Sequence, residues 1–170
     1  MSWSRPAAGF LSSKKVNDRN PLSLQKARNY AFYLLKFRPR SEDEIYQRLK
    51  RKKFDQAVIR QTLSFLKDRG FINDEDFARA WVESRIKKPL GLRKLTQELR
   101  LKGIDKEIID RQIGRIKKDY SEEEIVLKLA RARFDKCNGI EPLKAKRRIF
   151  AYLLRHGFSP EVVIDAVNNL

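Results

Sequence analysis

The sequence predicts an all-α protein built from three tandem three-helix repeats, arranged as an elongated, curved array of small helical bundles. Two observations predict this fold. Apolar residues recur at spacings of three and four from Ser23 onward, and no segment of useful length alternates as a half-buried strand would. Three similar segments also follow one another along the chain, which is typical of arrays whose units stack on their neighbours.

The repeat is visible in the segments EIYQRLKRKKFDQAVIRQTL, KLTQELRLKGIDKEIIDRQI and RIFAYLLRHGFSPEVVIDAV. Leu49 of the first segment corresponds to Leu99 of the second, 50 positions later, and to Leu153 of the third, a further 54 positions along. Each segment has the pattern of two helices joined by a short turn, and another helical stretch precedes it. We therefore expect the three leucines to occupy equivalent core positions.

These patterns divide the chain into four parts. We expect the first repeat over 23–72, the second over 73–118 and the third over 119–170. The remaining segment, 1–22, lacks periodicity and has more basic than acidic residues. It is predicted to be a flexible basic tail.

The first helix of each repeat has a candidate N-cap residue, because Ser and Asn side chains accept from the exposed first-turn N–H groups. These residues are Ser23, Asn73 and Ser121. Gly70 is expected to end the last helix of the first repeat in the left-handed conformation. The acids at 74–76 would then lie in the first turn of the next helix, where its dipole favours negative charge. This stretch is interpreted as a joint between repeats.

The formal net charge of +17, from 39 Lys and Arg against 22 Asp and Glu, predicts a surface that seeks a polyanion. The single cysteine, Cys137, allows no intramolecular disulfide and fits a reducing compartment. No apolar run approaches the length of a membrane span, and no signal-peptide pattern opens the chain. We expect a cytoplasmic protein that does not enter membranes.

The residue inventory argues against an enzyme. The one histidine, His156, sits at a predicted helix end, where a cation suits the helix dipole without any catalytic role. There is no zinc-ligand spacing, no Ser–His–Asp or Cys–His constellation and no glycine-rich phosphate loop. The acidic stretch after Ser41 is interpreted as a capping box with Glu44. We expect no catalytic residues, no cofactor and no metal.

The positive charge is concentrated in the first two repeats, which carry +8 and +5, whereas the third carries +1. In the middle helices, the apolar positions set a buried face and the Lys and Arg residues point away from it. We predict a basic binding surface of these residues: Arg48, Lys50, Arg51, Lys52, Arg93, Lys94, Arg100, Lys102, Lys144 and Arg148. The alternative is that these long side chains only cover apolar surface with their stems.

Four segments together resemble the RecX family of bacterial recombination regulators: RSEDEIYQRLKRKKF, DRGFINDEDFARAWVESR, GLRKLTQELRLKGI and LLRHGFSPEVVIDAV. The resemblance covers about residues 23–170. It implies three tandem three-helix repeats, no catalytic activity and binding to the RecA recombinase filament. It also implies that the protein limits RecA ATP hydrolysis, strand exchange, filament growth and co-protease function in recombination, repair and the SOS response. One departure is Lys53, where the family often has Gly.

Two alternative functions remain open on the residues alone. The chain could be a module that binds DNA or RNA directly, although the outward residues lack the grouped Asn, Gln or Arg that read base edges. It could also be a helical scaffold for another acidic partner. The favoured interpretation is a monomer that binds the RecA filament and, without sequence preference, single- and double-stranded DNA.

Overall fold

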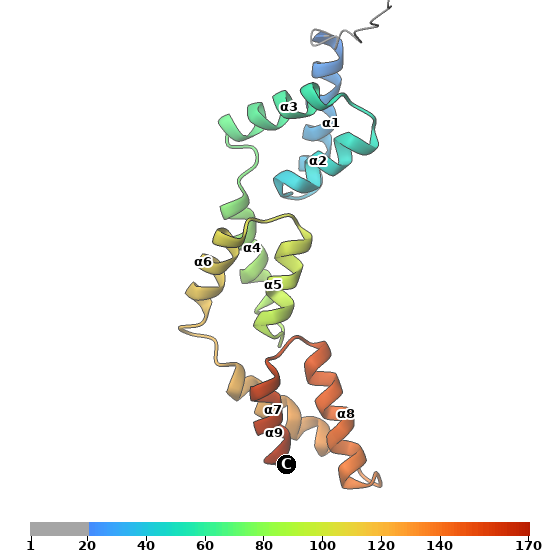
Figure 1. The fold of residues 1–170 in the computed structure, drawn as a ribbon, viewed down its shortest axis with the longest axis vertical. Coiled ribbons are helices and arrows are strands. Elements are labelled where there is room, and N and C mark those ends of the chain that lie inside the picture. The colour runs from blue at the N-terminus through green and yellow to red at the C-terminus, as the bar shows by residue number, and fades with distance from the viewer. Residues whose placement is uncertain (1–20) are drawn as a thin grey trace, which may run out of the picture.

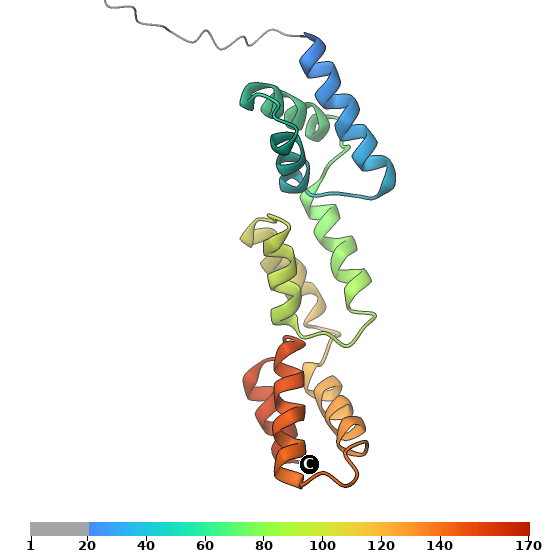
Figure 2. The same ribbon diagram turned by 90° about the vertical axis from the view of Figure 1, so that its right-hand side faces the viewer.

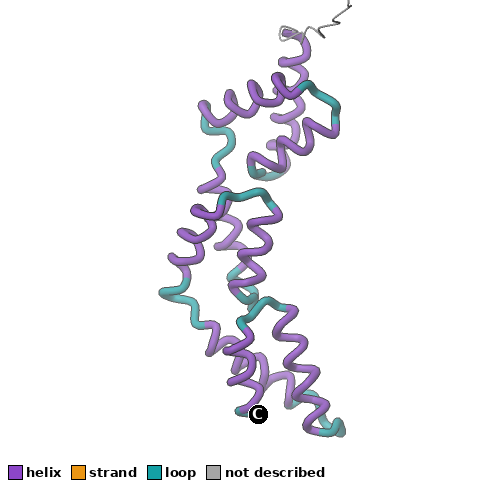
Figure 3. The backbone as a smooth tube through the Cα atoms, in the orientation of Figure 1, coloured by secondary structure: helices purple, strands orange, loops and turns teal. Residues whose placement is uncertain are grey.

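The computed structural model describes residues 21–170, and Figure 3 shows that all of the regular structure in this range is helical. The predicted all-α fold is confirmed. The helices are α1 (Pro21–Phe37), α2 (Glu42–Arg51), α3 (Gln56–Asp68), α4 (Asp74–Arg85), α5 (Leu92–Leu101), α6 (Lys106–Ile116), α7 (Glu122–Phe134), α8 (Pro142–Arg155) and α9 (Pro160–Asn168).

The helices pack in consecutive groups of three, which we call unit one (α1–α3), unit two (α4–α6) and unit three (α7–α9). Figures 1 and 2 show the units stacked in an elongated column, gently bowed in the view of Figure 1. Each unit has its own apolar core. The equivalent leucines Leu49, Leu99 and Leu153 are all completely buried, one in each core. The prediction of three three-helix repeats is confirmed.

Side chains cap the starts of six helices in the described range, α2, α4, α6, α7, α8 and α9, whereas the N-cap residues of α3 and α5 make no such bond. Asn73 accepts hydrogen bonds from the first-turn N–H groups of α4, and Ser121 accepts one in α7, as predicted. Ser23 was wrongly predicted as an N-cap, because α1 begins at Pro21 and Ser23 lies inside it. Proline at the first position of a helix has the required φ angle and lacks an N–H that would be unpaired there anyway. The predicted tail therefore overlaps α1 at its last two residues, and its other residues lie outside the described range.

The turn after the middle helix of each unit contains a residue with positive φ. This residue is Lys53 in unit one, with φ of 60°, and a glycine in the other two units, Gly103 and Gly157. Glycine takes this conformation without the steric cost that a Cβ adds. Gly70 also has positive φ, at the end of α3, as predicted.

Units one and two meet at joint one, where residues 41–44 lie against Asp74 and residues 102–103. The buried Ser41 hydroxyl donates to the carbonyl oxygen of Lys102 at 2.6 Å. The Asp74 carboxylate accepts from the backbone N–H of Glu42 at 2.8 Å. The ammonium of Lys102 pairs with Glu44 at 2.6 Å. The Glu44 carboxylate is therefore occupied by both Lys102 and Arg38. Only the Ser41 half of the predicted capping box forms, with the Ser41 hydroxyl accepting from the backbone N–H of Glu44.

Units two and three meet at joint two, where residues 90–93 lie against residues 156–157, 120 and 122. The backbone N–H of Gly91 donates to the carbonyl of His156 at 2.9 Å, and that of Arg93 donates to the carbonyl of Gly157 at 3.2 Å. The two backbones are so close that a Cβ on Gly91 would lie 2.0 Å from the carbonyl carbon of Gly157. Joint two therefore includes a direct contact of backbone on backbone, beside the side-chain hydrogen bonds of Tyr120 and Glu122.

The two joints share one hydrogen-bond arrangement. The first residue of the next unit accepts a hydrogen bond from the first N–H of the preceding middle helix. At joint one Asp74 accepts from Glu42, and at joint two Glu122 accepts from Leu92 at 2.6 Å. Burial raises the pKa of both Asp74 and Glu122, although these backbone hydrogen bonds oppose the shift. Each carboxylate thereby caps a helix in a different unit from its own.

Candidate nucleic-acid and protein interface

The predicted basic residues of α2 lie on its solvent side. Ile45 and Leu49 are fully buried, so that the opposite face of the helix points outward. The four cations of this group are exposed: Arg48, Lys50, Arg51 and Lys52. None of them forms an ion pair within the part of the chain that the structure describes. Their charge is available to a partner.

The predicted residues of α5 divide into two kinds. Arg93 and Arg100 are exposed and Lys94 is half-buried, and no carboxylate in the described range pairs with them. Lys102 is different, because it pairs with Glu44 and lies 4.8 Å above the Trp81 ring. Lys102 is thus held inside joint one and offers little to a ligand.

The predicted residues of α8 lie apart from the others. Lys144 and Arg148 are both exposed. Arg148 lines a small cavity of about 450 Å³ in unit three, where the Arg133 guanidinium lies 3.3 Å from the centre of the Tyr152 ring. The ten predicted residues therefore divide among the three units, with four in unit one, four in unit two and two in unit three.

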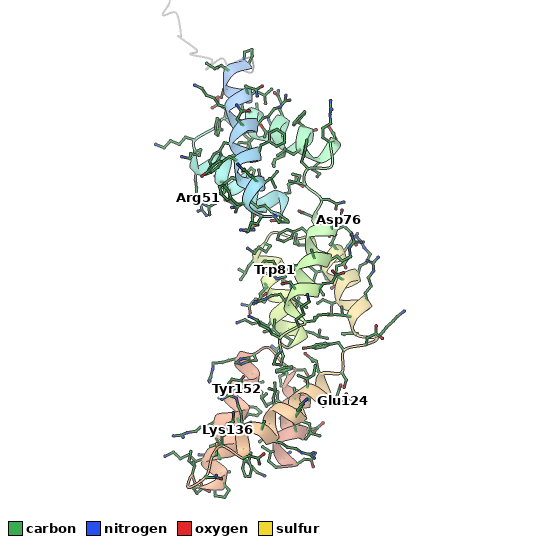
Figure 4. All side chains as sticks on the ribbon, turned by 180° about the vertical axis from the view of Figure 1, so that it is seen from behind. Arg51, Asp76, Trp81, Glu124, Lys136 and Tyr152 are labelled. Atoms are coloured by element: carbon green, nitrogen blue, oxygen red, sulfur yellow. The ribbon has the colours of Figure 1, made fainter. Side chains whose placement is uncertain are left out.

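Figure 4 shows how the labelled charges are distributed across the column. Arg51 of unit one and Lys136 of unit three lie on one side, whereas Asp76 and Glu124 lie on the other. Both acids are in the first turn of the helix that opens their unit. The opening helices thus place negative charge on the side away from these cations.

Glu98, the one carboxylate within α5, is already paired. Glu98 accepts from the Arg85 guanidinium at 2.7 Å and from the Trp81 indole at 3.0 Å. Burial raises the pKa of Glu98, but these hydrogen bonds outweigh the burial and hold the pKa below its ordinary value. Since Glu98 stays ionised and paired, it does not cancel the outward charge of α5.

Sequence reasoning missed two cations, Lys117 and Arg155. Together with Arg93, Lys94 and Arg100 they line one groove between units two and three. Both lie at helix ends, where a positive charge is already explained by the helix dipole. The repeat pattern does not show that these two ends lie beside α5.

The described residues, 21–170, lack two other kinds of structural feature. No group of three or more His, Cys, Asp or Glu side chains in this range could hold a metal ion. No helix in the same range is both long and apolar enough to cross a membrane.

The sequence matches three family descriptions in chain order. Residues 27–66 match the pattern described as "RecX, first three-helix domain", residues 73–111 match the second such domain and residues 121–167 match the third. Each match falls within one structural unit. The three matches together cover well over half of the chain.

Individual relatives agree with these matches. The chain is 35% identical over 155 residues to "Regulatory protein RecX" of Mycobacterium sp. (strain KMS), covering 88% of this chain and 84% of that protein. It is 36% identical over 147 residues to the protein of the same name from Chlorobium phaeobacteroides (strain BS1), covering 86% and 94%. The crystal structure of RecX from Lactobacillus salivarius has the same fold, with a TM-score of 0.74, 21% identity and coverage of 89% and 98%.

Proposed function

The chain belongs to the RecX family of regulatory proteins, and from this premise we propose that it binds the RecA–DNA filament and mainly inhibits RecA. The inhibited activities are ATP hydrolysis, strand exchange and co-protease function. The observation that carries the proposal is the match of all three units to RecX domains in order. On this proposal the protein is a cytoplasmic monomer that acts by binding and not as an enzyme.

The elongated shape, with exposed cations in several units, supports a filament as the target. A column of three linked units extends its contacts over a distance that no single unit reaches (Figure 2). One exposed charge contributes little alone, but several weak contacts in one chain gain from high effective concentration. A polymeric partner that repeats along its axis is suited to such a surface.

The same charges support weak DNA binding without sequence preference. The outward residues are mainly Lys and Arg, which bind phosphate oxygens but carry little base information. Released counterions then supply most of the binding free energy, so the affinity should fall by orders of magnitude between low and high salt. Fluorescence anisotropy of labelled oligonucleotides at two salt concentrations measures this. A salt-independent affinity or a preferred sequence contradicts it.

The test of filament binding reverses four exposed cations: Lys50, Arg51, Arg93 and Arg100, each to Glu. Lys102 is left unchanged because it supports joint one. The control reverses four other exposed cations with no ion pair among the described residues: Arg60, Lys106, Lys128 and Arg131. Both variants undergo the same change of net charge.

The measurement is the DNA-dependent ATP hydrolysis of RecA with each protein added, and thermal melting confirms folding. We expect wild type and the control variant to inhibit and the first variant to lose at least about tenfold in potency, because attraction to phosphate becomes repulsion. If the folded first variant inhibits as well as wild type, these residues are not the interface. If wild type leaves RecA unaffected at excess concentration, the RecA proposal fails.

A further inference from the structure

The groove between units two and three is lined by more cations without an ion pair among the described residues than the cavity in unit three. It has a volume of about 840 Å³ and runs along α5, past the end of α6, to the turn between α8 and α9. Figure 1 shows the start of α5 beside that turn. Its five charged lining residues are all cations: Arg93, Lys94, Arg100, Lys117 and Arg155. No carboxylate lines the groove, and none of the five cations is ion-paired in the described range.

The position of two of these cations works against helix stability. Arg93 and Lys94 are the second and third residues of α5, and the positive end of a helix dipole favours acidic side chains there. The first turns of α2, α4 and α7 each carry three acids, whereas α5, like α1, α3 and α8, has none in its first turn. The carboxylate that caps this helix start, Glu122, comes from unit three, so α5 itself supplies no acid at this end to offset Arg93 and Lys94. They concentrate positive potential at the mouth of the groove.

The equivalent pocket at joint one is lined by acidic residues. It has a volume of about 260 Å³ and is lined by Glu42, Asp43 and Asp74, together with Tyr46, Leu63 and Gly103. No cation of the described range lines it, although Lys67 beside it pairs with Glu42 at 2.8 Å. Asp43 is the counterpart of Arg93, 50 positions earlier in the chain. The same geometry thus carries negative charge in one place and positive charge in the other. The positive charge at joint two therefore comes from residues such as Arg93 and does not follow from the repeat.

The lining also defines which part of a nucleic acid would fit. The neutral polar side chains are Thr96 and Gln97, and no aromatic ring lines the groove to stack on a base. The backbone N–H groups at the start of α5 are already bonded, those of Leu92 and Arg93 across joint two. Contacts would therefore come from side chains, and arginine forks match phosphate oxygens in pairs.

We propose that this groove binds the sugar–phosphate backbone of a DNA strand through Arg93, Arg100 and Arg155, with Lys94 and Lys117 beside them. Arg93 and Arg100 lie seven positions apart on α5, which is roughly 10 Å along the helix axis. At this spacing the two guanidinium groups can contact different phosphates of one strand. The inference rests on the proposed function, since a regulator of a recombinase filament meets DNA. Beyond that function, the proposal places the strand in this groove and identifies the sugar–phosphate backbone as the part that is bound.

The test uses an abasic single-stranded oligonucleotide, which keeps the phosphates and lacks the bases, and no RecA is present. The groove variant carries Arg93→Gln, Arg100→Gln and Arg155→Gln. The control carries Arg60→Gln, Lys106→Gln and Arg131→Gln, which removes the same charge from exposed positions outside the groove. We expect the groove variant to bind at least about tenfold more weakly, with a salt slope smaller by about 2, because three phosphate contacts are lost. The control should stay within about threefold of wild type.

A second measurement needs no variant. Phenylglyoxal modifies exposed arginines, and mass spectrometry shows which of them the oligonucleotide protects. Arg93, Arg100 and Arg155 should be protected, whereas Arg60 should not.

Three results overturn the inference: equal weakening of both variants, no binding of the abasic strand by wild type at low salt, or no protection. If the groove variant loses a polyglutamate peptide but keeps the oligonucleotide, the groove binds an acidic protein segment instead. If wild type binds the oligonucleotide through the groove and does not inhibit RecA, the proposed function fails and the groove assignment stands.

Discussion

The two joints bring together equivalent elements but hold them by different chemistry. At joint one, the contacts depend on the side chains of Ser41, Lys102 and Asp74. At joint two, Gly91 and Gly157 allow two backbones to touch and bond directly. A backbone hydrogen bond carries no titratable group, whereas an ion pair responds to pH and salt. The comparison teaches that the repeat fixes the geometry of a joint, and a few residues decide which conditions loosen it.

The largest effect is expected from Gly91→Ala. The added Cβ would lie 2.0 Å from both the carbonyl carbon and the carbonyl oxygen of Gly157, and the backbone cannot move aside without breaking the bonds of joint two. Overpacking of this kind costs typically about 1–3 kcal/mol, and we expect the upper end here. Urea unfolding measures the loss, and small-angle X-ray scattering detects separation of units two and three.

Gly114→Ala is the matched control for this change. Gly114 lies within α6, and a Cβ there would have no neighbour within 4 Å. It should leave scattering unchanged and raise stability by up to about 1 kcal/mol, because alanine favours the helix. If Gly91→Ala behaves like Gly114→Ala in both measurements, joint two does not depend on glycine contact.

A smaller effect is expected from Ser41→Ala at joint one. This change removes the cap of α2 and leaves the carbonyl of Lys102 without its cross-unit donor. Loss of the cap costs about 1 kcal/mol, and the unpaired carbonyl adds a further loss of about 1 kcal/mol. The control is Ser121→Ala, because the Ser121 side chain caps α7 and, among the described residues, bonds only within the first turn of that helix. Equal loss of unfolding free energy in the two variants would show that the Ser41 bond to unit two contributes nothing.

The smallest effect concerns the response of joint one to acid. Burial alone would raise the pKa of Glu44, but hydrogen bonds from Arg38 and Lys102 lower it from 4.5 to about 2. Because the folded-state pKa lies below the unfolded one, this group stabilises the fold above pH 4.5, and the contribution is lost as the pH falls towards 2. At joint two, the raised pKa of Glu122 has the opposite sign. Acid should therefore weaken joint one and spare joint two.

The measurement is the urea midpoint of wild type and Glu44→Gln between neutral pH and pH 2.5. Wild type should lose about 1 kcal/mol more than the variant over this interval, after allowance for solvent screening of a partly exposed pair. Asp74 offsets part of this loss, because burial raises its pKa and protonation then favours the folded state. Glu124→Gln, which changes an exposed acid of α7, is the control and should follow wild type. Parallel curves for wild type and Glu44→Gln would exclude Glu44 as the acid-sensitive group.

The sequence was sufficient to predict the three units because their signals are local. Leu49, Leu99 and Leu153 recur at nearly constant spacing, and Asn73 and Ser121 precede helical periodicity in the way that N-caps do. The start of α1 was misplaced because Pro21 and Ser23 are both acceptable near a helix start, and nothing in the local pattern decides between them.

The candidate site was predicted less completely because its parts come from different units. The role of Lys102 depends on Glu44, 58 positions away, and single-sequence periodicity carries no information on such a pair. The groove requires Arg155 of unit three to lie beside Arg93 of unit two, a contact made by the stacking of units. One signal was available: cations replace acids in the first turn of α5, contrary to the other unit-facing helix start in α2.

Lys53 sets a limit on the length to which this architecture could be extended. At the equivalent turns, a Cβ on Gly103 would lie 2.3 Å from the Asp43 Cβ, and one on Gly157 would lie 2.2 Å from the Lys94 Cβ, because an adjoining unit rests there. Lys53 carries a side chain at this place. A fourth unit added before unit one by protein engineering would therefore collide with it, and Lys53→Gly would be the first substitution that such a lengthened column requires.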